Sequence, residues 1–142
     1  MGSNSHFTVA IHILTLLANH ADEALTSGFI AGSVNTNPVF IRRLLASLRN
    51  ARLVSSQAGP GGGWVLLRKP ADITLRDVYR AMEAKSLFAM HSSPPNPKCP
   101  VGGNIQQVLG KQFDSTLSTL ERELQQTTIQ DLVKEVRALA AH

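Results

Sequence analysis

The feature that most constrains the fold is a glycine-rich block between two short apolar segments. Residues 57–64 read QAGPGGGW, which places four glycines and one proline in eight positions. The segments LVSS at 53–56 and WVLL at 64–67 are candidate strands, so the block predicts the tip of a β-hairpin. Three uses fit such a tip: it cradles phosphate, it enters a narrow groove, or it is only a structural turn.

The spacing of this block excludes two common phosphate-binding loops. A Walker loop needs Lys and then Ser or Thr directly after its last glycine, followed by a helix. The dinucleotide-binding pattern also leads into a helix. Here Trp64 and a candidate strand follow Gly63, so a groove-binding tip and a plain turn remain.

Apolar residues at helical spacing predict helices on both sides of the hairpin. The expected ranges are 7–19, 27–34, 38–50, 75–84, 101–126 and 128–140. Thr26 or Ser27 can cap the second helix, and Pro38 suits the first turn of the third. Three helices followed by a hairpin is the order of a winged helix-turn-helix. The predicted fold class is therefore mainly α-helical with a small β-hairpin wing.

A long helix near the C-terminus is expected to form a dimer contact. Its apolar stripe is too extensive to face water on an isolated helix, and pairing with a second copy would bury it. The stripe consists of Ile105, Leu109, Phe113, Leu117, Leu120 and Leu124. Residues 86–100 contain four prolines and no helical period, which indicates a loop or linker. We therefore expect a domain over 1–85, this loop, and a helical dimerisation region over 101–142.

Positive charge is concentrated in the first half of the chain. From Ala24 to Ala71 there is no acidic residue, although this segment carries five arginines and one lysine. Residues 71–142 carry eight basic and eight acidic residues. A one-sided positive stretch is typical of a protein that binds a polyanion. A solvated basic face would carry the same charge, but the coincidence with the helix and hairpin order favours DNA.

The segments that carry these features resemble a known family. NPVFIRRLLASLRNARLVSS followed by GPGGGWVLLRKPADITLRDVYRAME is similar to the bacterial Rrf2 family, which includes IscR, NsrR and CymR. The later segment NPKCPVGGNIQQVL resembles its YwnA-like branch. The resemblance implies a dimeric, cytoplasmic transcriptional regulator, commonly a repressor, with the long helix as dimer contact. A symmetric dimer predicts a palindromic DNA operator.

The resemblance also implies which residues contact DNA. Family members place the start of the third helix on base edges, and the wing near the minor groove. The matching positions are Thr36, Asn37, Val39, Arg42 and Arg43 on the helix, and Gln57, Gly61, Gly62 and Arg68 on the wing. The family often has an arginine before the Gly-Pro pair, where this chain has Ala58. Minor-groove reading is then lost, or passes to Gln57 or Arg68, and any one arginine is equally suited to a phosphate.

Cys99 is the single cysteine, and it lies in the proline-rich loop. Iron–sulfur members of the family use three cysteines there, so we expect no iron–sulfur cluster and no metal, because His91 adds only one further ligand. Cys99 also precedes an expected helix N-terminus and follows Lys98, which would favour a reactive thiolate. A redox-sensing thiol and a cysteine that is merely packed or exposed both remain open.

Two other classes of function are weaker. An enzyme that uses Cys99 and His91 would have no oxyanion motif beside them, so we expect no enzymatic activity. A pure protein-interaction module would explain the long helix but leaves the acid-free basic segment without a purpose. No apolar run approaches the length needed to span a bilayer, and no secretory leader is visible, so we expect a cytoplasmic protein.

Overall fold

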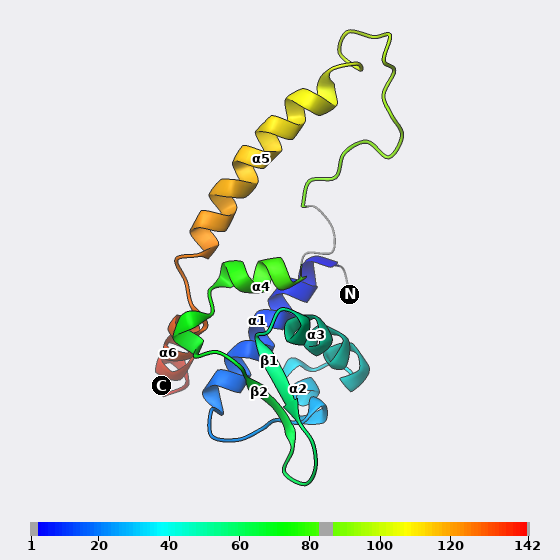
Figure 1. Ribbon diagram of the computed structural model, residues 1–142. Helices are drawn as coiled ribbons and strands as arrows, with labels where there is room; N and C mark the ends of the chain where they lie inside the picture. Colours follow the sequence, from blue (N-terminus) through cyan, green and yellow to red (C-terminus); the bar gives the residue numbers. More distant parts are fainter. Residues whose placement is uncertain (1–2, 83–86, 142) are drawn as a thin grey trace.

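The computed structural model describes residues 3–82 and 87–141. It begins with α1 Ser3–Asn19, α2 Ser27–Val34 and α3 Pro38–Asn50. The strands β1 Val54–Gln57 and β2 Gly63–Leu66 follow, and the short 3-10 helix η1 Pro70–Asp72 leads into α4 Leu75–Met82. The chain ends with α5 Ile105–Leu124 and α6 Ile129–Ala140 (Figure 1). The mainly helical fold with one antiparallel hairpin confirms the predicted class.

Local capping sets the starts of α2 and α3. The Thr26 hydroxyl accepts a hydrogen bond from the backbone N–H of Phe29 at 3.1 Å, and Asn37 Oδ1 accepts one from Phe40 at 2.8 Å. Each bond satisfies an N–H that lacks a partner in the first turn. Asn35, at the end of α2, has a φ of 65°, a conformation that asparagine tolerates better than most residues. α1 begins at Ser3 rather than at the expected residue 7.

The strand bounds of the hairpin differ by one position from the sequence expectation. β1 begins one residue later and β2 one residue earlier than expected, with Gln57 opposite Gly63. Leu53 is buried just ahead of β1, and its carbonyl accepts a hydrogen bond from Leu67 N–H at 3.0 Å. The apolar run therefore marks the buried residues, whereas the paired ladder is displaced toward the glycine block.

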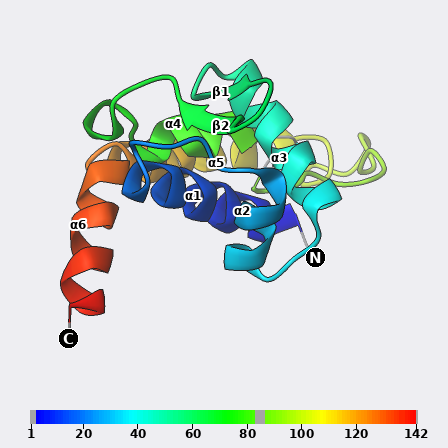
Figure 2. The same ribbon diagram turned by 90° about the horizontal axis from the view of Figure 1, so that it is seen from below.

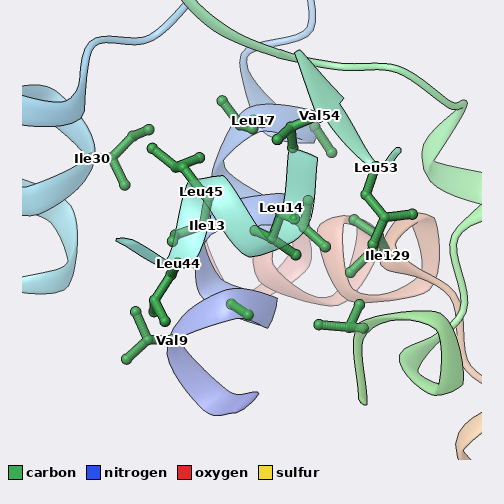
Figure 3. Close-up of a cluster of buried hydrophobic side chains, with 14 of the residues drawn as sticks. Val9, Ile13, Leu14, Leu17, Ile30, Leu44, Leu45, Leu53, Val54 and Ile129 are labelled. Atoms are coloured by element: carbon green, nitrogen blue, oxygen red, sulfur yellow. The ribbon is translucent and has the colours of Figure 1, made fainter. Parts of the chain in front are cut away.

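One hydrophobic core surrounds α1 (Figure 3). Ile13 and Leu14 of α1 are fully buried, and side chains from α2, α3, β1, α4 and α6 pack around them. The largest fully buried side chains are Ile13, Leu14, Ile30, Ile41, Leu45, Leu48, Leu53, Ile73, Ile129, Val54, Val78 and Val133. Each contributes about 1.5–3 kcal/mol of transfer free energy, so this core fixes the orientation of α3 and the hairpin.

The last helix belongs to the same core. Ile129 and Val133 are buried in it, and Arg137 Nε donates to Asn19 Oδ1 at 2.8 Å. α6 thus lies against the C-terminal end of α1 (Figure 2). The predicted dimerisation region over 101–142 includes α6, and the structure shows that the apolar face of this helix packs on the core of its own subunit. We refer to α1–α4, the hairpin, η1 and α6 as the body.

α5 extends away from the body, and the loop 87–104 lies toward its far end (Figure 1). We refer to this loop together with α5 as the arm. The helix begins at Ile105 rather than at residue 101, because 101–104 form turns. α4 is described to Met82, and the last two residues of the expected helix lie outside the described residues. Across 3–82 and 87–141, no helix combines the length and apolar character needed to cross a membrane.

Candidate nucleic-acid interface

Helix α3 presents one face to the core and the opposite face to solvent. Its buried residues are Ile41, Leu44, Leu45 and Leu48. Val39, Arg42 and Arg43 are exposed on the other side. Since no acidic residue occurs between Ala24 and Ala71, the exposed guanidinium groups have no carboxylate neighbour within this segment. The exposed side of α3 is therefore positively charged and open to a ligand.

Thr36 and Asn37 have structural tasks at the turn before α3. The Thr36 N–H donates to the Ala31 carbonyl at 3.0 Å, which closes the end of α2. Asn37 uses its side-chain oxygen as the cap of α3, while its side chain remains exposed. The amide nitrogen of Asn37 is not needed for this cap. Both predicted contact residues thus lie beside the exposed start of α3, and Asn37 keeps two N–H donors for a partner.

Trp64 attaches the hairpin to the body. Its backbone exchanges two hydrogen bonds with Leu25, with N···O distances of 2.7 and 3.1 Å. Its half-buried ring packs against the core, and the Arg49 guanidinium carbon lies 5.7 Å from the ring centroid. This distance suits a cation–π interaction. The hairpin and α3 are therefore held next to each other through Arg49 and Trp64.

The glycines of the hairpin tip have different local requirements. Gly61 has a φ of 73° and open space around its Cα, so only its backbone conformation favours glycine. At Gly62 a Cβ would lie 2.3 Å from the Gln57 carbonyl oxygen and 2.8 Å from that of Gly59. DNA contacts are predicted at both positions. The structure adds that Gly62 is required by the hairpin itself, so bulk there disturbs the tip with or without DNA.

Gln57 and Arg68 lie at opposite ends of the hairpin. Gln57 is exposed beside the tip, where its side chain can meet a ligand. Arg68 Nη2 instead donates to the Asp72 carbonyl at 2.6 Å and to Asp77 Oδ2 at 3.3 Å. These bonds fasten the end of the hairpin to η1 and α4. The DNA contact expected of Arg68 in place of the missing arginine at Ala58 stays a prediction, because these bonds use only Nη2 and the side chain remains exposed.

The arm carries the predicted apolar stripe without burying it. Ile105, Leu109, Phe113, Leu117, Leu120 and Leu124 are all only half-buried, and the described chain fully buries no residue of α5. Phe113 stacks on Phe88 of the loop with ring centroids 4.8 Å apart. Val101 and Val108 are largely exposed nearby. The arm therefore keeps an extended apolar surface that the body does not cover.

Polar contacts fix the other end of α5 to the body. Arg80 of α4 forms an ion pair with Glu121, and Arg76 Nη1 donates to Gln125 Oε1 at 3.1 Å. The N–H of Leu75 also donates to the carbonyl of Thr127 at 2.9 Å. α5 is thus attached near its C-terminal end, and the direction in which it leaves the body is defined by α4.

Cys99 lies in a tightly folded turn of the loop. Its thiol is exposed, and the backbone N–H groups of Gly102 and Val101 lower its pKa from the ordinary value. A Cβ at Gly102 would lie 2.5 Å from the Asn96 carbonyl oxygen, so glycine is required there. The direction of the shift agrees with the sequence expectation, but α5 starts only at Ile105, and the donors belong to the turn.

Comparison with known proteins assigns the family. The family described as "Rrf2: Iron-dependent Transcriptional regulator" matches residues 3–135. The chain belongs to the Rrf2 family. "Putative HTH-type transcriptional regulator YwnA" of Bacillus subtilis (strain 168) is 45% identical over 135 residues, which cover 94% of this chain and 98% of YwnA.

Two solved structures are similar to this Rrf2 chain. "Crystal structure of a putative DNA binding protein" is 43% identical, with a TM-score of 0.72 over 90% of this chain and 98% of that one. The structure "T. potens IscR" is 22% identical, with a TM-score of 0.69 over 93% of this chain and 85% of that one, and it supports the fold alone.

The family description mentions iron, which raises the question whether the residues of this chain could ligate an iron–sulfur cluster. A cysteine-ligated cluster needs three or four thiolates or imidazoles in one place. This Rrf2 chain has one cysteine, and the described residues contain no group of three or more His, Cys, Asp or Glu placed to hold a metal. His91 Nδ1 lies 3.5 Å from Gln106 Nε2. The residues therefore do not fit such a cluster within one subunit.

Sequence reasoning missed two residues beside the predicted interface. Arg49 and Asn50 are exposed at the end of α3, and Arg49 also contacts Trp64. The position of Asn50 could have been predicted, because it lies eleven residues after Val39 and thus on the same helix face. The contact between Arg49 and Trp64 has no such signal, since it depends on how the hairpin folds back.

Proposed function

We propose that this Rrf2 protein is a homodimeric, sequence-specific DNA-binding regulator. In this proposal the exposed face of α3 lies in the major groove, and the hairpin tip lies over the backbone toward the minor groove. The observation that carries it is the pair of exposed arginines, Arg42 and Arg43, on an acid-free helix held beside the hairpin. Arginine offers two parallel donors to guanine or a charge-assisted bond to phosphate.

Dimerisation through the arm is the second part of the proposal. The half-buried stripe of α5 is continuous over about five turns, and a symmetry mate would cover it. Two copies related by a two-fold axis would present two α3 helices, so the operator is a palindrome with half-sites about one helical turn apart. Where such an operator overlaps a promoter, the bound dimer would exclude the polymerase, and the protein would act as a repressor.

Regulation through Cys99 is the third part. The lowered pKa favours the thiolate, which is the nucleophilic form. Attack on hydrogen peroxide would form an S–O bond and break the O–O bond, and hydroxide would leave and take up a proton to give water. The sulfenic acid can then condense with a second thiol to a disulfide, releasing a second water. Either product would change the loop that leads into α5. We also infer that the subunit carries no iron–sulfur cluster, so anaerobically purified protein should be colourless and iron-free.

Selection of bound sequences from a random DNA pool tests the DNA-binding part. We expect an enriched palindrome, and a plot of log affinity against log salt with a slope of roughly −5 to −7 if each subunit neutralises about three or four phosphates. Arg43→Ala should weaken operator binding by about 1–3 kcal/mol. Lys134→Ala, which removes an exposed positive charge from α6, is the control and should change affinity little. A flat salt response with no enriched sequence would contradict the proposal.

A further inference from the structure

The outermost ridge of α3 contains one apolar residue that the fold does not use. Val39, Arg43, Ala46 and Asn50 follow the spacing i, i+4, i+7 and i+11, so they share the face opposite the buried one. Ala46 is partly buried, and the other three are exposed. A small residue at the centre of this ridge allows close approach of another molecule, and Val39 stands at its N-terminal end.

Nothing in the packing of the body explains valine at this position. Val39 is 61% exposed, whereas its neighbour Phe40 is half-buried and lies 5.2 Å from the His6 ring. A β-branched side chain in a helix loses rotamer freedom and is a poorer helix former than alanine. Val39 therefore adds an apolar group to a basic surface without a gain from burial in the chain itself.

The major groove offers one apolar feature on its base edges, the C5 methyl group of thymine. A valine placed against any other base edge would cover hydrogen-bonding groups without replacing their partners. We propose that Val39 contacts a thymine methyl group in each half-site and so makes thymine at that position a specificity determinant. This inference rests on the proposed DNA binding, and it specifies one base of the operator that the protein recognises.

Arg43 gives the inference a position in the operator. It lies four residues after Val39 on the same ridge, which corresponds to about 6 Å along the helix axis. Successive base pairs are about 3.4 Å apart. If the ridge follows the groove, a guanine contacted by Arg43 lies roughly two base pairs from the thymine contacted by Val39.

Replacement of thymine by deoxyuridine tests this directly, because it removes only the methyl group. Each thymine of the selected operator is replaced symmetrically in both half-sites, and Kd is measured with the full-length protein at fixed salt. At one position the wild type should lose about fourfold in affinity per half-site, the value for one buried methyl group. Val39→Ala should weaken binding to the thymine operator and show no further loss with uracil at that position.

Val136→Ala is the matched control. Val136 is 50% exposed on α6, and this truncation should leave the full effect of uracil. A uracil effect that persists undiminished in Val39→Ala, or no uracil effect at any thymine, overturns the inference and leaves the proposed function standing. If the random pool yields no preferred sequence, the proposed function fails and the inference fails with it.

Discussion

The body and the arm treat their apolar residues in opposite ways. In the body, stripes from α1, α2, α3, α4 and α6 meet in one core, and Ile13, Leu45 and Ile129 are fully buried. In the arm, α5 carries an apolar stripe from Ile105 to Leu124, but the described chain buries none of these residues completely. An amphipathic helix of this kind is stable only when its apolar face is covered. The body therefore buries its apolar stripes within one subunit, whereas the stripe of the arm stays only half-buried there.

The contrast also separates what each part can do. The polar contacts that attach α5 to α4 leave the loop with Cys99 at the far end of the arm, away from α3 (Figure 1). A change near Cys99 would therefore occur away from the residues of α3 that are predicted to contact DNA. It would act on the proposed DNA site by changing how two arms pair, and hence the spacing of two α3 helices.

The largest effect is expected from charge on the arm's stripe. Leu117→Glu places a carboxylate in the proposed dimer contact, so the protein should become monomeric by light scattering. Operator affinity should then fall by a factor of about 10²–10⁴, because two linked half-site contacts become one. Thermal unfolding of the body should persist, since α5 contributes no fully buried residue to the described core.

Ser118→Glu is the control for this prediction. Ser118 follows Leu117 in the chain and is exposed on the helix face opposite the stripe. The same charge there should leave the dimer intact. A Leu117→Glu protein that stays dimeric would show that the arm's stripe is not the dimer contact.

The second prediction tests whether α6 belongs to the body. Ile129→Ala should lower the free energy of unfolding by about 2–5 kcal/mol, because it leaves a cavity in the core. Leu139→Ala changes a side chain of the same helix that is 77% exposed, and its effect should stay within about 0.5 kcal/mol. Urea titrations at one protein concentration measure both. Equal effects of the two truncations would remove α6 from the core.

The third prediction separates folding from DNA contact at the hairpin tip. Gly62→Ala forces the backbone of the tip apart and should cost about 1–3 kcal/mol, with displaced amide signals from residues 57–63. Gly61→Asn fits both the open space and the positive φ, so the hairpin should be retained. If Gly61→Asn folds normally and still weakens operator binding, the tip contacts DNA. If its affinity is unchanged, Gly61 serves only as a turn residue.

Most elements of the fold could be predicted from sequence because their signals are local. The cap of α2 at Thr26 and the position of Pro38 in the first turn of α3 agree with the sequence expectation, whereas the cap of α3 by Asn37 is a finding of the structure. The glycine block likewise predicts a hairpin. The exact strand bounds could not be predicted, since Leu53 is buried although the paired ladder begins only at Val54.

What the sequence leaves open lies where distant parts of the chain meet. Helical spacing at Ile129 and Val133 indicates a buried face but does not say whether α1 or a second subunit covers it. Arg68 looks like a free cation in the sequence, whereas the fold brings Asp77 within 3.3 Å of it. Gly62 is similar, because its close neighbour is the carbonyl of Gln57 across the hairpin. Such contacts depend on tertiary folding and carry no pattern in the sequence.

The smallest expected effect concerns the thiol at the far end of the arm. The N–H groups of Gly102 and Val101 lower the pKa of Cys99, so more thiolate is present at a given pH below the ordinary pKa. The pH profile of alkylation by iodoacetamide should therefore have its midpoint at lower pH than that of the same chain unfolded in urea. The gain in rate at neutral pH should be only a few-fold, because a less basic thiolate is also a weaker nucleophile.

The unfolded chain is the control for this profile, because it contains the same cysteine without the turn. Identical midpoints in the folded and unfolded protein would mean that the turn does not stabilise the thiolate. If the midpoints differ, peroxide treatment tests whether oxidation of Cys99 changes DNA binding. Operator affinity should change in the wild type and stay constant in Cys99→Ser. An equal response in both proteins would place the signal elsewhere, and no response in the wild type would leave Cys99 as a surface thiol whose turn lowers its pKa without regulating the body.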